Sequence, residues 1–208
     1  MSDKLNNIKT YDAGKSFIPG KKNIIKLSSN ESPFGPSKKV LNAISRASKK
    51  TNRYPVADCF ELKKNICKKF KVPIKNIFCG NGSDEILGLL CQLFLSKNDE
   101  VIIPKHSFLM YEIYASINNA KIKYSNVDDY AFKVEDIIKN ITNKTKIIFI
   151  AQPNNPTGMY LDKKSLERLI KRIPKRIMIV IDAAYSEFIN KADYTDGLKL
   201  IKRHNNII

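Results

Sequence analysis

The sequence lacks a long apolar run anywhere along its 208 residues. A transmembrane helix needs roughly 18 or more consecutive apolar residues, and no stretch reaches that length. Residues 1–17 also lack the apolar segment that a secretion signal carries. These absences argue against membrane and secreted proteins, so we expect a folded protein of the cytoplasm without a membrane partner.

Cysteine and histidine are scarce as well. The chain has 4 cysteines and 2 histidines, with no CxxC pair and no histidine at zinc-ligand spacing. The cysteines are Cys59, Cys67, Cys79 and Cys91. Without a secretion signal, reduced thiols in or near the core are the expected state. We therefore expect neither a disulfide nor a metal site.

Acidic residues are outnumbered by basic ones, 20 to 37, which gives a net charge of +17. Such an excess can indicate binding to nucleic acid or to phosphate groups. The lysines occur as scattered pairs without a long block, and arginine, the better reader of bases, is scarce. We favour a solvated lysine-rich surface without specific nucleic-acid binding, and a basic nucleic-acid binder remains an alternative.

Apolar runs typical of strands alternate with amphipathic segments of helical spacing. The expected strands are 100–104, 121–127, 146–150 and 177–181. The expected helices are 37–50, 85–95, 108–118, 134–141 and 162–172. A further helix is expected to be capped by Asp58 and to run to about Phe70. Residues 1–36 have the composition of an extended arm. The alternation predicts an α/β protein, a three-layer α/β/α arrangement with a mostly parallel sheet.

A glycine-containing turn, Gly80 to Asp84, precedes the helix expected from Glu85. The first N–H groups of a helix have no internal partner and lie at the positive end of the helix dipole. Gly82, Ser83 and Asp84 could therefore offer N–H groups to a phosphate. From this stretch alone, an ordinary strand-to-helix turn capped by Ser83 or Asp84 is the favoured interpretation. No Gly-Lys-Ser/Thr follows, so the turn is not a P-loop.

Polar residues follow the two strands expected at 146–150 and 177–181. Asn155 lies in a loop that reads AQPNNPTG, and Asp182 and Tyr185 follow the later strand. Ligands bind at strand ends of this kind in open α/β sheets. A carboxylate there needs a cationic partner, such as a protonated pyridine nitrogen, or several donors. Taken singly, these residues could be a turn former, a helix cap and a core tyrosine.

The combination of motifs resembles a known family. Asn154-Asn155-Pro156-Thr157-Gly158, followed by Asp182-x-x-Tyr185, resembles the fold type I aminotransferases that depend on pyridoxal 5′-phosphate (PLP). The stretches 27–36, 52–55, 80–85 and 106–111 are similar to histidinol-phosphate aminotransferases in particular. The resemblance extends over essentially the whole chain. It implies an N-terminal arm and small-domain segment at 1–36, and the first part of the PLP-binding large domain at 37–208.

The resemblance also implies a role for each matching residue. Gly82, Ser83 and Asp84 would bind the PLP phosphate, Phe108 would stack on the ring, Asn155 and Tyr185 would hydrogen-bond O3′, and Asp182 would pair with the ring nitrogen. Tyr54 would reach the cofactor of a neighbouring subunit, which implies a homodimer in the full-length protein. Tyr11 and Asn30 would contact the substrate.

The activity implied is amino transfer from histidinol phosphate to 2-oxoglutarate, giving imidazole-acetol phosphate and glutamate in histidine biosynthesis. The alternatives are an aromatic amino acid aminotransferase, a phosphothreonine-type decarboxylase, or a non-catalytic domain of the same fold.

Two departures from the family pattern stand out. Asp182-Ala183-Ala184-Tyr185 replaces the frequent Asp-Glu-Ala-Tyr, and this leaves the aspartate and the tyrosine in place. The family's Schiff-base lysine would follow a strand that begins near Asn206, whereas the sequence ends at Ile208. We therefore assign no catalytic residue, and we expect a truncated large domain that is inactive as the 208-residue chain.

Overall fold

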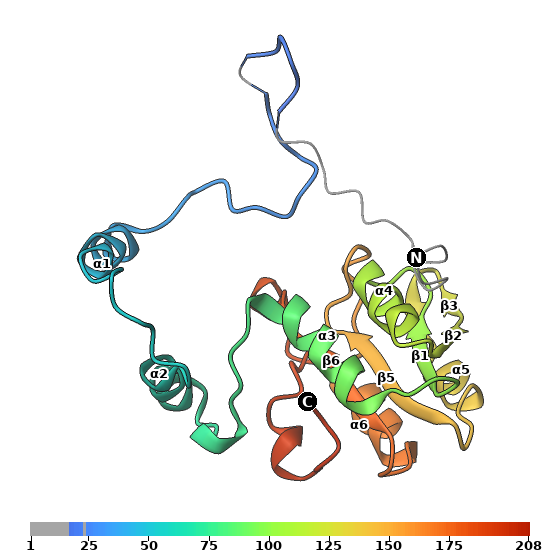
Figure 1. Cartoon of the computed structure of the whole chain (residues 1–208). Helices are drawn as coiled ribbons and strands as arrows, with labels where there is room; N and C mark the ends of the chain where they lie inside the picture. Colours follow the sequence, from blue (N-terminus) through green and yellow to red (C-terminus); the bar gives the residue numbers. More distant parts are fainter. Residues whose placement is uncertain (1–16, 23) are drawn as a thin grey trace. The chain divides into compact units, whose positions relative to one another are not determined.

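Residues 17–22 and 24–208 are described by the computed structural model of the chain (Figure 1). They divide into two units, one up to Cys79 and one from Gly80 to Ile208. The predicted boundary between residues 36 and 37 is a different division, based on the family, and it stays a prediction. Among the described residues, no helix combines the length and apolar character needed to cross a bilayer.

The first unit contains helices α1 (Lys38–Ser48) and α2 (Phe60–Phe70) and the 3-10 turn η1 (Ile74–Asn76). Ser37 caps α1, because its hydroxyl accepts a hydrogen bond from the Val40 N–H at 3.4 Å. The predicted cap of α2 was wrong by one residue. Cys59 is the capping residue, with a left-handed φ of 52°, and the Asp58 carboxylate accepts from the Phe60 N–H at 3.1 Å.

The second unit is built on a parallel sheet with the strand order β2-β1-β5-β6. Its strands are β1 (Glu100–Pro104), β2 (Lys121–Ser125), β5 (Thr145–Ala151) and β6 (Met178–Asp182). All three strand pairs are parallel, and Ile207 adds a further parallel bridge beside Ile179. The predicted α/β class with a mostly parallel sheet is confirmed.

Successive residues of the strands face opposite sides of the sheet, so the sheet has a core on each face. On one face, Val101 and Phe149 pack with helices α3 (Gly82–Phe94) and α4 (Leu109–Ile117). On the other, Ile102 and Ile148 pack with α5 (Val134–Lys139) and α6 (Lys163–Arg172). The strands are therefore buried on both sides, as their continuous apolar sequence predicts.

Four short elements of this unit were not predicted. Strands β3 (Val127–Asp128) and β4 (Ala131–Phe132) form an antiparallel hairpin, and the 3-10 turns η2 (Ser186–Phe188) and η3 (Leu200–Lys202) follow β6. The two hairpin turn residues, Asp129 and Tyr130, have φ values of 44° and 63°. Positive φ at both positions is typical of a type I′ turn, which usually contains glycine or asparagine.

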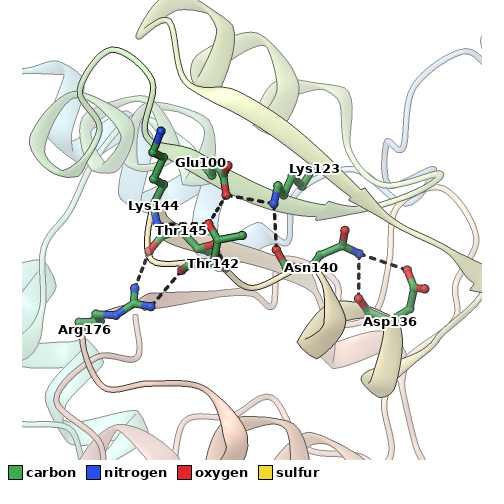
Figure 2. Close-up of polar contacts among 8 residues, drawn as sticks. All are labelled: Glu100, Lys123, Asp136, Asn140, Thr142, Lys144, Thr145 and Arg176. Carbon is green, nitrogen blue, oxygen red and sulfur yellow. Dashed lines mark hydrogen bonds and ion pairs between the residues drawn. The ribbon is translucent and has the colours of Figure 1, made fainter.

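A polar network closes the sheet at the amino-terminal ends of β1 and β5 (Figure 2). The Glu100 carboxylate accepts a hydrogen bond from the Thr142 hydroxyl and pairs with the Lys123 ammonium at 3.2 Å. Arg176 donates to the carbonyl oxygens of Thr145 and Thr142 at 3.1 and 2.9 Å. Burial opposes ionisation of Glu100, but these partners outweigh it and lower the pKa of its carboxyl. The network leaves the opposite, carboxyl-terminal edge of the sheet to the candidate site.

Candidate functional site

An open pocket with a cavity volume of about 70 Å³ lies at the carboxyl-terminal edge of the sheet, within the second unit. Five predicted residues line it: Ser83, Phe108, Asn155, Asp182 and Tyr185. The other lining residues are Tyr111, Ala151, Pro153 and Ala184. Parallel strands end at the same edge, and for this reason residues that lie far apart in the sequence meet here.

Asp182 is the last residue of β6 and is half-buried in the pocket wall. The Tyr111 hydroxyl donates to its Oδ2 at 2.8 Å, and the Ala184 N–H donates to its Oδ1 at 3.2 Å. Each carboxylate oxygen therefore has one donor from the protein and keeps acceptor capacity for a further group. A half-buried carboxylate held in this way suits a cationic ligand.

Tyr111 is a site residue that was not predicted from the sequence. Its ring is fully buried and stacks on Phe149, with the ring centroids 4.8 Å apart and the planes at 4°. Burial, and then the neighbouring Asp182 carboxylate, raise the pKa of the Tyr111 phenol far above its usual value. The phenol therefore stays protonated and acts as a donor. Its spacing from Phe108 was the available signal, since three residues bring side chains to one helix face.

The amino-terminal end of α3 lies at the pocket, where Ser83 is a lining residue. Gly82 has a φ of 75°, a left-handed conformation that favours glycine. The Glu85 carboxylate accepts a hydrogen bond from the Asn81 N–H at 2.6 Å, and this contact stabilises the turn that precedes the helix. The N–H groups of Ser83 and Asp84 belong to the first helical turn, which has no intrahelical acceptors for them. They remain available to an anion at the pocket.

Of the three residues predicted to bind phosphate, only Ser83 lines the pocket. The Asp84 carboxylate accepts a hydrogen bond from the Tyr114 hydroxyl at 2.8 Å. This contact ties the start of α3 to α4, so the side chain of Asp84 acts between helices. Any contribution of Asp84 to anion binding would come from its backbone N–H.

The loop after β5 carries Asn155 and is fixed by its neighbour Asn154. Asn154 is 3% exposed, and its Nδ2 donates to the carbonyl oxygen of His106 at 2.9 Å and to the Thr157 hydroxyl at 2.8 Å. His106 lies two residues before Phe108. The Asn154 side chain therefore links the loop that carries Asn155 to the loop that carries Phe108.

A second amide anchors the same loop on its other side. The buried Gln152 side chain donates to the Leu161 carbonyl at 2.6 Å and accepts from the Leu161 N–H at 2.9 Å. The Tyr194 hydroxyl donates to the Gln152 carbonyl at 2.7 Å. The Gln152–Pro153 and Asn155–Pro156 peptide bonds are both cis. The side-chain hydrogen bonds of Gln152 and Asn154 therefore hold the loop that carries Asn155.

Three predicted site residues remain, namely Tyr54, Asn30 and Tyr11. Tyr54 and Asn30 belong to the first unit, where the Tyr54 side chain is 100% exposed. Tyr11 lies outside the described residues. Their roles, contact with a neighbouring subunit and with substrate, stay predictions.

The fold is that of a class of enzymes, and comparison with known proteins identifies this class. A family model for the class I and II aminotransferases matches residues 22–208. The chain belongs to the class I and II aminotransferase family.

Curated relatives narrow the resemblance to one branch of this family. The chain is 45% identical over 201 residues to the histidinol-phosphate aminotransferase of Pelagibacter ubique, covering 97% of this chain and 56% of that protein. It is 39% identical to the protein of the same name from Paramagnetospirillum magneticum, again covering 97% of this chain and 56% of that protein. The chain thus spans about half the length of the curated relatives it matches.

Solved structures agree. The histidinol-phosphate aminotransferase of Clostridium acetobutylicum matches with a TM-score of 0.76 at 30% identity, over 86% of this chain and 53% of that one. The protein of that name from Sinorhizobium meliloti, solved in complex with pyridoxal-5′-phosphate, matches with a TM-score of 0.80 at 21% identity, over 86% of this chain and 49% of that one. The second likeness concerns the fold alone.

Proposed function

We propose that the chain forms the cofactor pocket of a PLP-dependent histidinol-phosphate aminotransferase. The reaction is amino transfer from histidinol phosphate to 2-oxoglutarate, giving imidazole-acetol phosphate and glutamate. The observation that carries the proposal is Asp182, a carboxylate at the end of β6 with two donors and a free side toward the pocket. The names of the relatives support the choice of substrate.

The residues of the pocket fit PLP in chemistry. Asp182 suits the protonated ring nitrogen, Phe108 offers an aromatic face, and Asn155 and Tyr185 offer an amide and a phenol to O3′. Ser83 and the first turn of α3 suit the phosphate, because a helix start combines free N–H groups with a favourable dipole. The backbone N–H groups of Gly82 and Asp84 belong to the same proposal.

When bound, PLP supplies an electron sink that stabilises negative charge at the α-carbon of the amino acid. Asp182 contributes by holding the proton at the ring nitrogen, since its negative charge favours the cationic form of the ring. Asn155 and Tyr185 orient the ring through O3′, and Phe108 excludes water from one face. None of the residues that line the pocket is a lysine. Binding to these residues is therefore non-covalent.

A homodimer and a cytoplasmic location are part of the same proposal. The homodimer rests on the family resemblance, in which Tyr54 reaches the cofactor of the neighbouring subunit. Tyr11 and Asn30 are proposed to contact the substrate on the same basis.

The test uses the full-length protein that contains this chain. Glutamate formed from 2-oxoglutarate is measured with histidinol phosphate, and phenylalanine serves as the competing amino donor. We expect the higher kcat/KM with histidinol phosphate, and we expect Asp182→Ala to abolish transfer while binding of the cofactor phosphate survives. A higher kcat/KM with phenylalanine would overturn the substrate, and undiminished activity of Asp182→Ala would overturn the role of Asp182.

A further inference from the structure

The contact between Tyr111 and Asp182 joins two residues that are 71 positions apart, at a distance of 2.8 Å. Tyr111 comes from α4 and Asp182 from the end of β6. The Tyr111 ring is fixed by burial and by stacking on Phe149, which lies on β5, the strand beside β6. The donor is therefore held in one place by the core of the sheet.

Two donors with fixed origins set the orientation of the Asp182 carboxylate. The Ala184 N–H holds Oδ1 from the chain that follows β6, and the Tyr111 hydroxyl holds Oδ2 from the side of α4. Since Tyr111 is protonated throughout the physiological range, it neutralises no charge. It donates a hydrogen bond to the Asp182 carboxylate as a neutral group and adds no charge of its own.

We propose that Tyr111 is a positioning residue that aims the Asp182 carboxylate at the cationic ring nitrogen of the cofactor. The proposal rests on the proposed function, because it assumes that the pocket takes a pyridoxal ring. Tyr111 also lines the pocket, but its hydroxyl is directed to Asp182. Its effect on the ring is therefore transmitted through the carboxylate.

A purely structural role for Tyr111 predicts something different. The Tyr111 ring fills the core against Phe149, and loss of that packing would weaken the binding of every ligand of the pocket to the same extent. Tyr111→Phe keeps the ring and removes only the hydroxyl. A positioning role predicts that this variant loses affinity for a ligand with a ring nitrogen and keeps affinity for one without it.

The experiment compares two ligands on the 208-residue chain by equilibrium dialysis. One is pyridoxamine 5′-phosphate, which has no aldehyde and so does not react with the many lysines of the chain. The other is its 1-deaza analogue, in which CH replaces the ring nitrogen. The measured quantity is the ratio of the two dissociation constants, which isolates the contribution of the ring nitrogen.

We expect wild type to prefer pyridoxamine phosphate, and Asp182→Asn to bring the ratio close to one. Tyr111→Phe should reduce the preference by about tenfold or more, the lower end of the range expected for loss of a hydrogen bond to a charged group. Tyr114→Phe is the matched control, because it removes a tyrosine–aspartate hydrogen bond of the same 2.8 Å length from the same helix, to Asp84. Its ratio should equal that of wild type.

Equal weakening of both ligands by Tyr111→Phe, or no change in either, would overturn the positioning role. Absence of any binding by wild type would overturn the proposed cofactor site, and the inference with it. Tyr111→His, which keeps a ring with an N–H donor, provides a second measurement if the phenylalanine variant does not fold. A ratio within about threefold of wild type supports the proposal, and a ratio equal to that of Asp182→Asn overturns it.

Discussion

Replacing Asn154 by alanine tests whether one buried amide holds two walls of the pocket together. The substitution removes two hydrogen bonds, to the His106 carbonyl and to the Thr157 hydroxyl, from a side chain that is 3% exposed. Each neutral bond contributes about 1 kcal/mol net, so the free energy of unfolding should fall by about 2 kcal/mol. A larger loss is not expected, because His106 is exposed and water can reach its carbonyl oxygen.

Urea denaturation of the 208-residue chain, followed by circular dichroism, measures this difference. Asn126→Ala is the control, since Asn126 is an exposed asparagine of the same unit and should change stability by less than about 0.5 kcal/mol. Asn154→Ala should also weaken the binding of pyridoxamine phosphate and of its 1-deaza analogue to the same extent. The substitution removes the hydrogen bonds that hold the loops of Asn155 and Phe108 and leaves the contacts of Asp182 unchanged. A stability within about 0.5 kcal/mol of wild type would refute the reasoning.

Three further predictions concern the rest of the second unit. The pKa of the Glu100 carboxyl is lowered in the folded state, so Glu100 stabilises the fold above its ordinary pKa of 4.5. This contribution is lost as the pH falls through the lower pKa of the folded state. The stability difference between wild type and Glu100→Gln, measured by urea denaturation, should therefore shrink as the solution is acidified. Burial raises the pKa of Cys91 to about 12, so iodoacetamide at about pH 8 should leave Cys91 unmodified and label the half-buried Cys59, Cys67 and Cys79, as read by mass spectrometry. Gly197→Ala should cost about 2–4 kcal/mol, since its φ is +78° and a Cβ would lie 2.7 Å from the Ile181 Cδ1, whereas Gly158→Ala, with a φ of +73° and no atom within 4 Å, should cost about 1 kcal/mol in the same denaturation assay.

The sheet could be predicted because its strands are buried on both faces. Strand β1 occupies the residues expected for it, and β5 and β6 differ from the expected ranges by one residue at each end. A continuous β-branched run has few other folded solutions in an alternating α/β chain. The hairpin β3–β4 had no such signal, since its turn residues Asp129 and Tyr130 lack the glycine that usually marks a type I′ turn.

The site was predictable where a residue's position follows from strand order alone. Asn155 and Asp182 follow neighbouring parallel strands, so both had to reach the same edge of the sheet. Asn154 was harder, because its sequence context marks a turn former and gives no sign of the His106 carbonyl 48 positions away. Tyr111 was harder still, because a tyrosine on the apolar face of a helix usually only packs.

The charge balance around Asp182 explains why this pocket should select a cation and reject a neutral ring of the same shape. Its two protein donors, the Tyr111 hydroxyl and the Ala184 N–H, are both neutral, so the carboxylate keeps its full negative charge. Apolar groups of Phe108, Ala151 and Pro153 line the same pocket and cannot solvate that charge. A cationic ring nitrogen would compensate the negative charge of Asp182 directly. A neutral ring would displace water from the carboxylate without forming an interaction that offsets the cost of desolvation. The proposed specificity for a protonated pyridine ring would therefore depend on the groups around Asp182 as much as on Asp182 itself.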